Sequence, residues 1–189
     1  THQVKTPISN IRMYSDTIIN NDLSKEQEKE FLNVISNQVD KLEFLMDSLT
    51  KMSKLETNLI VLNKESSKFM ECIEKAKEQV RPLAEKKNIE IEIMGENCII
   101  QYDKKWTLEA ICNILENAIK YTSQNGKIKI HLEKLENFLK IDIIDNGIGI
   151  DEENISNIFK RFFRERKVYN IEGIGIGLYL SKNIIENQN

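Results

Sequence analysis

The sequence lacks the features that mark several common classes of protein. No apolar run approaches the ~20 residues of a membrane-spanning helix. The P-loop motif G-x-x-x-x-G-K-[ST] is absent, which excludes that class of nucleotide site. The three cysteines, Cys72, Cys98 and Cys112, show no paired metal-ligand spacing, so we expect buried thiols in a reducing compartment. The first residue is not Met, and we interpret the chain as a fragment of a longer protein.

Neither sign of charge dominates the sequence. The formal net charge is −3 over 189 residues, which gives no general attraction to nucleic acids or to acidic membranes. We therefore expect no nucleic-acid partner and no direct membrane contact. Hydrophobic residues make up 40% and charged residues 30% of the sequence, as is typical of folded domains, and the length fits one domain or two small ones.

Glycine is absent from the first 57 residues, which contain a single proline, Pro7. This stretch predicts two helices with a break at residues 20–22, and Ser24 followed by Gln27 predicts a capping box for the second helix. Apolar residues of the second helix follow alternating three- and four-residue steps around Gln38, which is a heptad seam. The seam consists of Phe31, Ile35, Leu42, Leu45, Leu49 and Met52, and a parallel stripe of Leu32, Val39 and Met46 widens it.

So wide an apolar face exceeds what two helices can bury between themselves. A homodimer that forms a four-helix bundle would cover it. Docking of the hairpin against the rest of the same chain is the alternative.

After about residue 58 the pattern changes to mixed α/β. Alternating apolar residues predict half-buried strands, and Asp103 is placed to cap a helix. We expect strands at 89–93, 98–101, 127–132 and 138–144, helices at 68–87, 104–121 and from 173 onward, a short strand or linker at 59–67, and short helix and loop at 151–172.

Two motifs of this second part carry polar groups suited to a nucleotide. On a predicted helix, Asn113 and Asn117 share one face with Lys120 nearby. An amide oxygen can coordinate Mg²⁺ and a lysine can neutralise phosphate oxygen, although asparagines on a helix are more often simply solvated. Asp145 opens the motif D-N-G-I-G after a predicted strand, where a carboxylate can accept a hydrogen bond from the adenine amino group; a plain glycine-rich turn is the alternative.

Two further motifs follow in order. The segment F-K-R-F-F-R ends at Arg164 and by itself fits an ordinary amphipathic helix. The segment G-I-G-I-G-L begins at Gly173 and opens the last predicted helix, so that backbone amides can approach phosphate groups. Residues 164–172 between them are charged, and we predict a mobile lid there.

In this order and spacing, the four motifs closely resemble the N, G1, F and G2 boxes of sensor histidine kinases, whose ATP-binding fold is shared with gyrase, chaperone and mismatch-repair ATPases. The opening H-Q-V-K-T-P resembles the phosphoacceptor box of that family, usually H-E-x-[RK]-T-P. The resemblance covers nearly the whole chain and implies an α+β protein. It implies a two-helix hairpin at 1–60 that dimerises into a four-helix bundle. It also implies a Bergerat-type α/β sandwich at 66–189 that binds Mg-ATP. Members of the family usually continue into further strands, so we expect the C-terminal strands of the sandwich to be missing from this sequence.

The resemblance also implies a role for each motif residue. His2 would accept the γ-phosphate of ATP and pass it to an aspartate in the receiver domain of a response regulator, Pro7 would bend the first helix, and Thr6 matches the residue associated with phosphatase activity on the regulator. Asn117 would bind magnesium, with Asn113 beside it. The nucleotide would be held by Lys120, Tyr121, Asp145, Gly147, Gly149, Gly173, Gly175 and Gly177, and the lid would be anchored by Phe159, Phe162 and Phe163 with Arg164 near phosphate.

One departure from the family pattern keeps other functions open. Gln3 stands where the family usually has Glu or Asp, and Gln is a far poorer base. A dimeric nucleotide-binding module with weak kinase activity, and a phosphatase-dominant protein, are therefore alternatives; a general ATPase of the gyrase class leaves His2 and the heptad seam unexplained. The family resemblance also implies that the chain is a cytoplasmic fragment of a membrane-anchored bacterial sensor.

Overall fold

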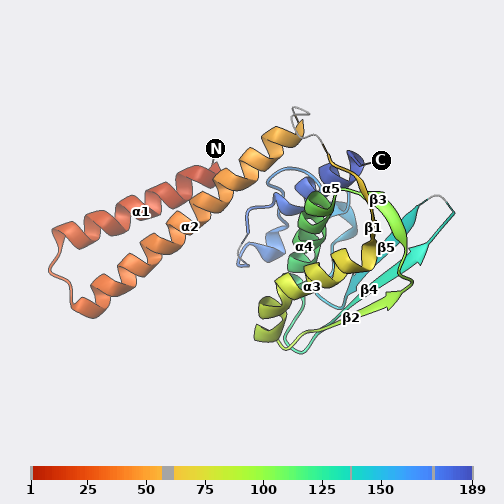
Figure 1. Ribbon diagram of the computed structural model, residues 1–189. Coiled ribbons are helices and arrows are strands. Elements are labelled where there is room, and N and C mark those ends of the chain that lie inside the picture. The colour runs from red at the N-terminus through yellow and green to blue at the C-terminus, as the bar shows by residue number, and fades with distance from the viewer. Residues whose placement is uncertain (1, 57–61, 137, 172, 189) are drawn as a thin grey trace. The chain divides into compact units, whose positions relative to one another are not determined.

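The computed structural model describes residues 2–56, 62–136, 138–171 and 173–188, and the chain divides into two compact units, Thr1–Leu59 and Ile60–Asn189 (Figure 1). We call the first unit the helical hairpin and the second the α/β unit. In the described parts of the chain, no helix combines the length and the apolar character that crossing a membrane requires.

The helical hairpin consists of α1 (His2–Asn20) and α2 (Lys25–Glu56). The predicted capping box is confirmed: the Gln27 backbone amide donates to Ser24 Oγ at 3.2 Å, and the Ser24 amide donates to Gln27 Oε1 at 3.0 Å. These two bonds satisfy donors that the start of a helix leaves without a partner. The rings of Tyr14 and Phe31 lie 5.2 Å apart and join the two helices.

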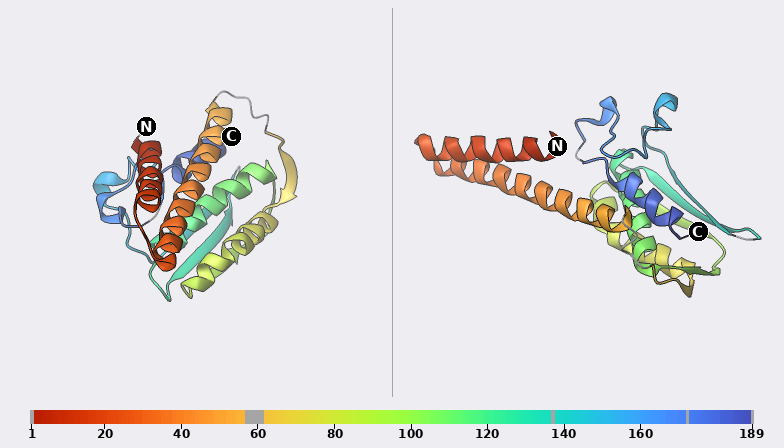
Figure 2. Two further views of the ribbon diagram at one scale, coloured as in Figure 1. Left: turned by 90° about the vertical axis from the view of Figure 1, so that its left-hand side faces the viewer. Right: turned by 90° about the horizontal axis from the view of Figure 1, so that it is seen from above.

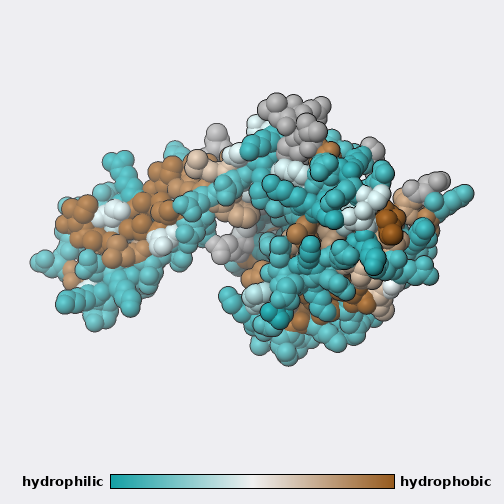
Figure 3. All heavy atoms as spheres, in the orientation of Figure 1, coloured by the Kyte–Doolittle hydropathy of each residue, from teal (hydrophilic) through white to brown (hydrophobic). Residues whose placement is uncertain are grey.

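Much of the apolar surface of the hairpin remains exposed. The three residues of the widening stripe, Leu32, Val39 and Met46, are 51%, 40% and 69% exposed. Apolar atoms gather over this unit in Figure 3. Other exposed apolar residues of the hairpin are Val4, Ile8, Met13, Ile19 and Phe44. An exposed apolar face of this extent is typical of a surface that binds a partner.

The α/β unit contains two sheets and three α-helices. Strand β1 (Glu65–Lys68) pairs antiparallel with β3 (Ile99–Tyr102). In the larger sheet, the order is β2-β4-β5: β2 (Glu90–Gly95) runs parallel to β4 (Lys127–Lys134), and β5 (Leu139–Asp145) runs antiparallel to β4. The helices are α3 (Phe69–Lys86), α4 (Lys104–Tyr121) and α5 (Gly177–Glu186), and two short 3-10 helices cover Glu152–Asn154 and Arg166–Val168.

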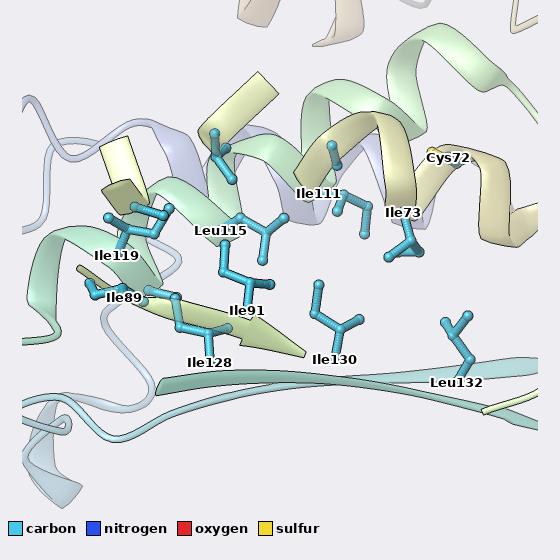
Figure 4. Packing of buried hydrophobic residues seen from close by; sticks show 14 of the residues in the cluster. Cys72, Ile73, Ile89, Ile91, Ile111, Leu115, Ile119, Ile128, Ile130 and Leu132 are labelled. Atoms are coloured by element: carbon cyan, nitrogen blue, oxygen red, sulfur yellow. The ribbon is translucent and has the colours of Figure 1, made fainter. Parts of the chain in front are cut away.

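The core of this unit lies between the larger sheet and the helices α3 and α4, which lie side by side (Figure 2). Alternate residues of β4 point to the same face, and Ile128, Ile130 and Leu132 are at most 2% exposed. Figure 4 shows these side chains directed toward Leu115 and Ile73 of the helices. This packing holds the apolar side of α4 against the sheet and thereby fixes the direction in which the polar side of the helix points.

The structure confirms the predicted α+β fold and corrects one boundary. The last helix was expected to begin at Gly173, but α5 begins at Gly177. Gly173 and Gly175 have φ angles of +151° and +79°, which a right-handed helix does not contain. Of the short strand or linker expected at 59–67, Glu65–Lys68 is the strand β1, and residues 57–61 lie outside the described residues.

Candidate functional site

The centre of the site is the polar side of α4. Asp103 caps this helix, because its carboxylate accepts the Trp106 amide at 2.9 Å. Leu115 and Ile119, on the opposite side, are buried in the core. The four-residue spacing then places Asn113 and Asn117 together on the side that faces away from the sheet.

Both asparagines have unused hydrogen-bonding capacity. The Asn113 Nδ2 atom is buried and has no hydrogen-bond partner among the described residues. The side-chain amide of Asn117 makes no hydrogen bond to any other described residue. A buried amide without a partner is costly, and a bound ligand would satisfy it. The start of α5 lies beside this amide, since a Cβ atom at Gly177 would make an ordinary contact with Asn113 Oδ1 at 3.6 Å.

The last turn of α4 brings a cation to the G2 box. Lys120 Nζ lies 5.0 Å from the centre of the Tyr121 ring, and a Cβ atom at Gly173 would collide with the same Nζ atom. Burial raises the pKa of Tyr121, an effect that Arg164 opposes and Glu165 reinforces. The Lys120 ammonium group of the N box therefore lies beside the first glycine of the G2 box, which comes more than fifty residues later in the sequence.

The G1 box is held against the same end of α4. The Ile148 amide donates to the Tyr121 carbonyl at 3.2 Å, and a Cβ atom at Gly147 would lie 2.5 Å from that oxygen. Asp145 is exposed at the end of β5, and its Oδ1 atom accepts the Gly147 amide at 2.9 Å. The second carboxylate oxygen therefore stays available for a ligand. Gly149 has a φ of +66° and open space around it.

The G1 box also contains a residue that sequence reasoning missed. Asn146 Oδ1 accepts the Lys127 backbone amide at 2.8 Å, which ties the turn to the first residue of β4. A polar residue between Asp and Gly is a weak signal in a sequence. It becomes informative only when the neighbouring strand is known.

The F box and the G2 box are joined through their backbones. The Phe162 amide donates to the Gly175 carbonyl at 2.8 Å, and Phe162 itself has a φ of +62°. A Cβ atom at Gly175 would lie 2.5 Å from the Phe163 carbonyl oxygen. Glycine is therefore required at this position by close approach as well as by its positive φ. Phe159, the first residue of the F box, is 40% exposed.

Arg164 is engaged within the predicted lid. Its Nη2 atom donates to the carbonyls of Val168 at 2.6 Å and of Ile171, while its Nε atom is buried with no partner among the described residues. The guanidinium thus organises the segment from 164 to 171. The role near phosphate that the family resemblance implies for it stays a prediction.

A second cluster in this segment was not predicted. The carboxylate of Glu165 is buried, accepts the Asp151 amide at 3.2 Å and lies 3.0 Å from Lys167 Nζ. Lys167 also pairs with the Asp151 carboxylate at 2.7 Å, and these bonds, first that to Asp151, raise the pKa of Lys167. The cluster connects the residues after the G1 box with those after the F box.

The proposed phosphoacceptor residues lie at the start of the hairpin. α1 begins at His2, and Gln3 and Thr6 belong to its first turns, with Pro7 inside the helix. The side chain of His2 lies outside the described residues. The structure thus gives the helical setting of the phosphoacceptor box, and the two units are described separately.

Comparison with known proteins gives matches over both units. Residues 1–58 match the family model of the His Kinase A (phospho-acceptor) domain. Residues 102–189 match that of the histidine kinase-, DNA gyrase B- and HSP90-like ATPase. Drug sensory protein A of Synechocystis sp. (strain ATCC 27184 / PCC 6803 / Kazusa) is 31% identical over 202 residues, which cover 98% of this chain and 30% of that protein. The chain spans about a third of the length of the first curated relatives that it matches.

Solved structures agree with these matches. Acinetobacter baumannii histidine kinase AdeS is similar with a TM-score of 0.78 and 25% identity, over 98% of this chain and 86% of that one. Histidine kinase ThkA, in complex with response regulator protein TrrA, is similar with a TM-score of 0.80 and 25% identity, over 99% of this chain and 52% of that one.

The fold and the site define a nucleotide-binding α/β unit that follows a helical phospho-acceptor hairpin. The chain belongs to the sensor histidine kinases, and it corresponds to the catalytic core of that family. This confirms the family that the five sequence motifs indicated.

Proposed function

We propose that the chain phosphorylates itself on His2 at the expense of ATP and passes the phosphoryl group to an aspartate of a response regulator. The observation that carries this proposal is the unsatisfied polar side of α4, where a buried Asn113 amide without a partner lies beside Asn117. It stands in an ATPase-family domain, which follows along the sequence a phospho-acceptor hairpin whose first helix begins at a histidine.

We assign the nucleotide to the part of the α/β unit where the four boxes meet. Lys120 would neutralise phosphate oxygen, and the free carboxylate oxygen of Asp145 would accept a hydrogen bond from the adenine amino group. Tyr121, Phe162 and Arg164 would border the nucleotide. Backbone at Gly147, Gly149, Gly173, Gly175 and Gly177 would shape the pocket, since a side chain at several of these positions would collide with neighbouring atoms.

Magnesium fits the donor set at the N box. The amide oxygens of Asn117 and Asn113 are hard oxygen ligands, and Mg²⁺ is commonly bound by one or two such ligands together with phosphate oxygens. When bound, the ion would neutralise charge on the phosphates. Asn117 is the proposed ligand because its side chain is not engaged elsewhere among the described residues.

The acceptor chemistry requires little activation of the histidine. An imidazole with a pKa near ~6.5 is mostly neutral in the cytosol, so that a ring nitrogen can attack the γ-phosphorus. The new N–P bond forms as the bond from phosphorus to the bridging oxygen breaks, and ADP leaves. Positioning and charge neutralisation supply most of such catalysis.

The proposed partners are a second copy of the chain and a receiver domain. The exposed stripe of Leu32, Val39 and Met46 supports pairing of two hairpins into a four-helix bundle. The similarity to ThkA, solved in complex with response regulator protein TrrA, supports the second partner. We further propose that the chain is a cytoplasmic part of a membrane-anchored bacterial sensor.

Gln3 supports a second candidate function. With a weak base beside His2, the chain would act mainly as a nucleotide-binding dimer or, through Thr6, as a phosphatase of the regulator. This candidate predicts loss of phosphate from a phosphorylated regulator in the presence of ATP, without phosphohistidine on the chain.

One labelling experiment separates the two candidates. The purified chain is incubated with Mg-ATP labelled at the γ-phosphate, beside His2→Ala and Asn117→Ala. Acid-labile, alkali-stable label that both substitutions abolish is the result expected of a kinase acting through His2. ATP binding without such label would replace the kinase by the second candidate.

A further inference from the structure

A lysine outside all four boxes closes the end of the helix that carries the N box. Lys87 follows directly after α3. Its Nζ atom donates to the carbonyls of Ile119 at 2.9 Å, Lys120 at 2.7 Å and Thr122 at 2.9 Å. An ammonium group has three donors, and these three bonds use them all.

The carbonyls that Lys87 binds have no partner within a helix. The last four carbonyls of an α-helix point beyond its end, and the negative end of the helix dipole lies there. The remaining carbonyl of this turn, that of Tyr121, accepts the Ile148 amide of the G1 box at 3.2 Å. One lysine and one backbone amide of the G1 box therefore share the C-terminus of α4.

The lysine is itself held in place by two turns. Its carbonyl accepts the Asn125 amide at 2.8 Å, and Asn88 Nδ2 donates to Asn125 Oδ1 at 2.7 Å. Asn88 and Asn125 have φ angles of +51° and +61°, a conformation that asparagine tolerates better than most residues. The turn after α3 and the turn after α4 are thus joined side by side, and the Lys87 side chain starts from a fixed backbone.

We propose that Lys87 is a positioning residue for the nucleotide: it fixes the last turn of α4 so that Lys120 meets the phosphates and Tyr121 orients the G1 box. Without the Lys87 ammonium group, three carbonyls lose their hydrogen-bond donor, and the last turn of α4 has to form other hydrogen bonds. The side chain of Lys120 and the carbonyl of Tyr121 both belong to that turn. This inference rests on the proposed ATP site.

The test compares Mg-ATP affinity for wild type, Lys87→Met, Lys87→Arg and Lys86→Met, at a temperature where circular dichroism shows each variant to be folded. Lys86→Met is the matched control, because it removes the same charge from the neighbouring exposed position. We expect Kd to rise about tenfold for Lys87→Met, as befits the loss of charge-assisted hydrogen bonds, and to recover for Lys87→Arg, with no change for Lys86→Met.

A double-mutant cycle with Lys120→Met separates positioning from general stability. If Lys87 acts through Lys120, adding Lys87→Met to Lys120→Met raises Kd by much less than tenfold, about twofold at most. If Lys87→Met does not fold, Lys87→Gln takes its place in both measurements, since its amide retains two donors, and a rise of about threefold is expected.

Two outcomes would overturn the inference. An unchanged Kd in the Lys87 variants, even with a lowered unfolding temperature, would reduce the lysine to a purely structural cap. Full additivity with Lys120→Met would show that it does not act through that residue. Absence of ATP binding by the wild type would instead refute the proposed function itself.

Discussion

The two units of this chain bury their apolar residues to very different degrees. The α/β unit encloses a core in which Ile73, Leu115 and Ile128 are fully buried. The helical hairpin leaves Leu32, Val39 and Met46 between 40% and 69% exposed. Two helices offer each other one stripe, whereas a sheet with helices on its face can enclose side chains from both layers. The α/β unit therefore buries its core within one chain, whereas the hairpin leaves an apolar stripe that the proposed second copy would cover.

The most direct test of this difference in burial is to replace apolar residues of the exposed stripe with polar ones. Leu32→Glu combined with Met46→Glu is expected to convert the dimer to a monomer, because each helix would bring a charge to an apolar interface. Light scattering after size-exclusion chromatography measures the change. The matched control is Asn33→Asp with Asn37→Asp, which adds the same charge at exposed polar positions of the same helix. A double variant that stays dimeric would refute the four-helix bundle.

Truncating the core should affect the α/β unit strongly. Leu115→Ala removes a side chain that is 0% exposed, and we expect it to lower the free energy of unfolding by about 3 kcal/mol. Trp106, the single tryptophan, lies in this unit, so its fluorescence reports urea unfolding there. Leu32→Ala in the hairpin serves as comparison and should leave this transition unchanged. A loss below about 1 kcal/mol for Leu115→Ala would contradict the packing described here.

The α/β unit should also lose stability in alkali, because its core contains the buried thiol of Cys72. Burial raises the pKa of Cys72 from 9.0 to about 11, so the unfolded chain releases this proton at a lower pH than the folded one. The stabilisation that comes from the protonated Cys72 thiol is complete below pH 9 and is lost as the pH rises through 11. The free energy of unfolding then falls by up to about 1.4 kcal/mol per pH unit.

Cys72→Ala isolates this effect. The variant should be less stable than the wild type at pH 8, and the difference should shrink between pH 9 and 11 when urea unfolding is followed by Trp106 fluorescence. Parallel curves for the two proteins over that range would exclude Cys72 as a source of alkaline instability.

The smallest expected effect concerns the chemistry of the hairpin. Gln3→Glu should speed autophosphorylation, about threefold, because a carboxylate orients and deprotonates the neighbouring imidazole better than an amide does. Initial rates of label incorporation at equal ATP saturation measure it, with Gln3→Ala as the comparison. A rate equal to or below that of the wild type would refute the assignment of Gln3 as the cause of weak kinase activity.

Sequence reasoning succeeded where the signal is local. The capping box of Ser24 and Gln27, the cap at Asp103 and the alternation in β4 each depend on residues within a few positions of one another, and the structure contains all three. The helix start at Gly173 was wrong, because Gly173 and Gly175 adopt positive φ, the first beside Lys120 and the second against the F box.

The amino-acid sequence by itself determined the two-part organisation, the helices and strands, and the identity of the four boxes, since periodicity, caps and motif spacing are written along the chain. Only the tertiary structure decided that Lys87 closes α4, that Asn113 Nδ2 is buried with no partner in the described parts of the chain, and that Arg164 binds the carbonyls of its own segment. Lys87 meets carbonyls more than thirty residues away, and no local pattern encodes such a contact. It forms because packing of α3 and α4 on one sheet brings an ammonium group to a helix end, where carbonyls have no donor within the helix.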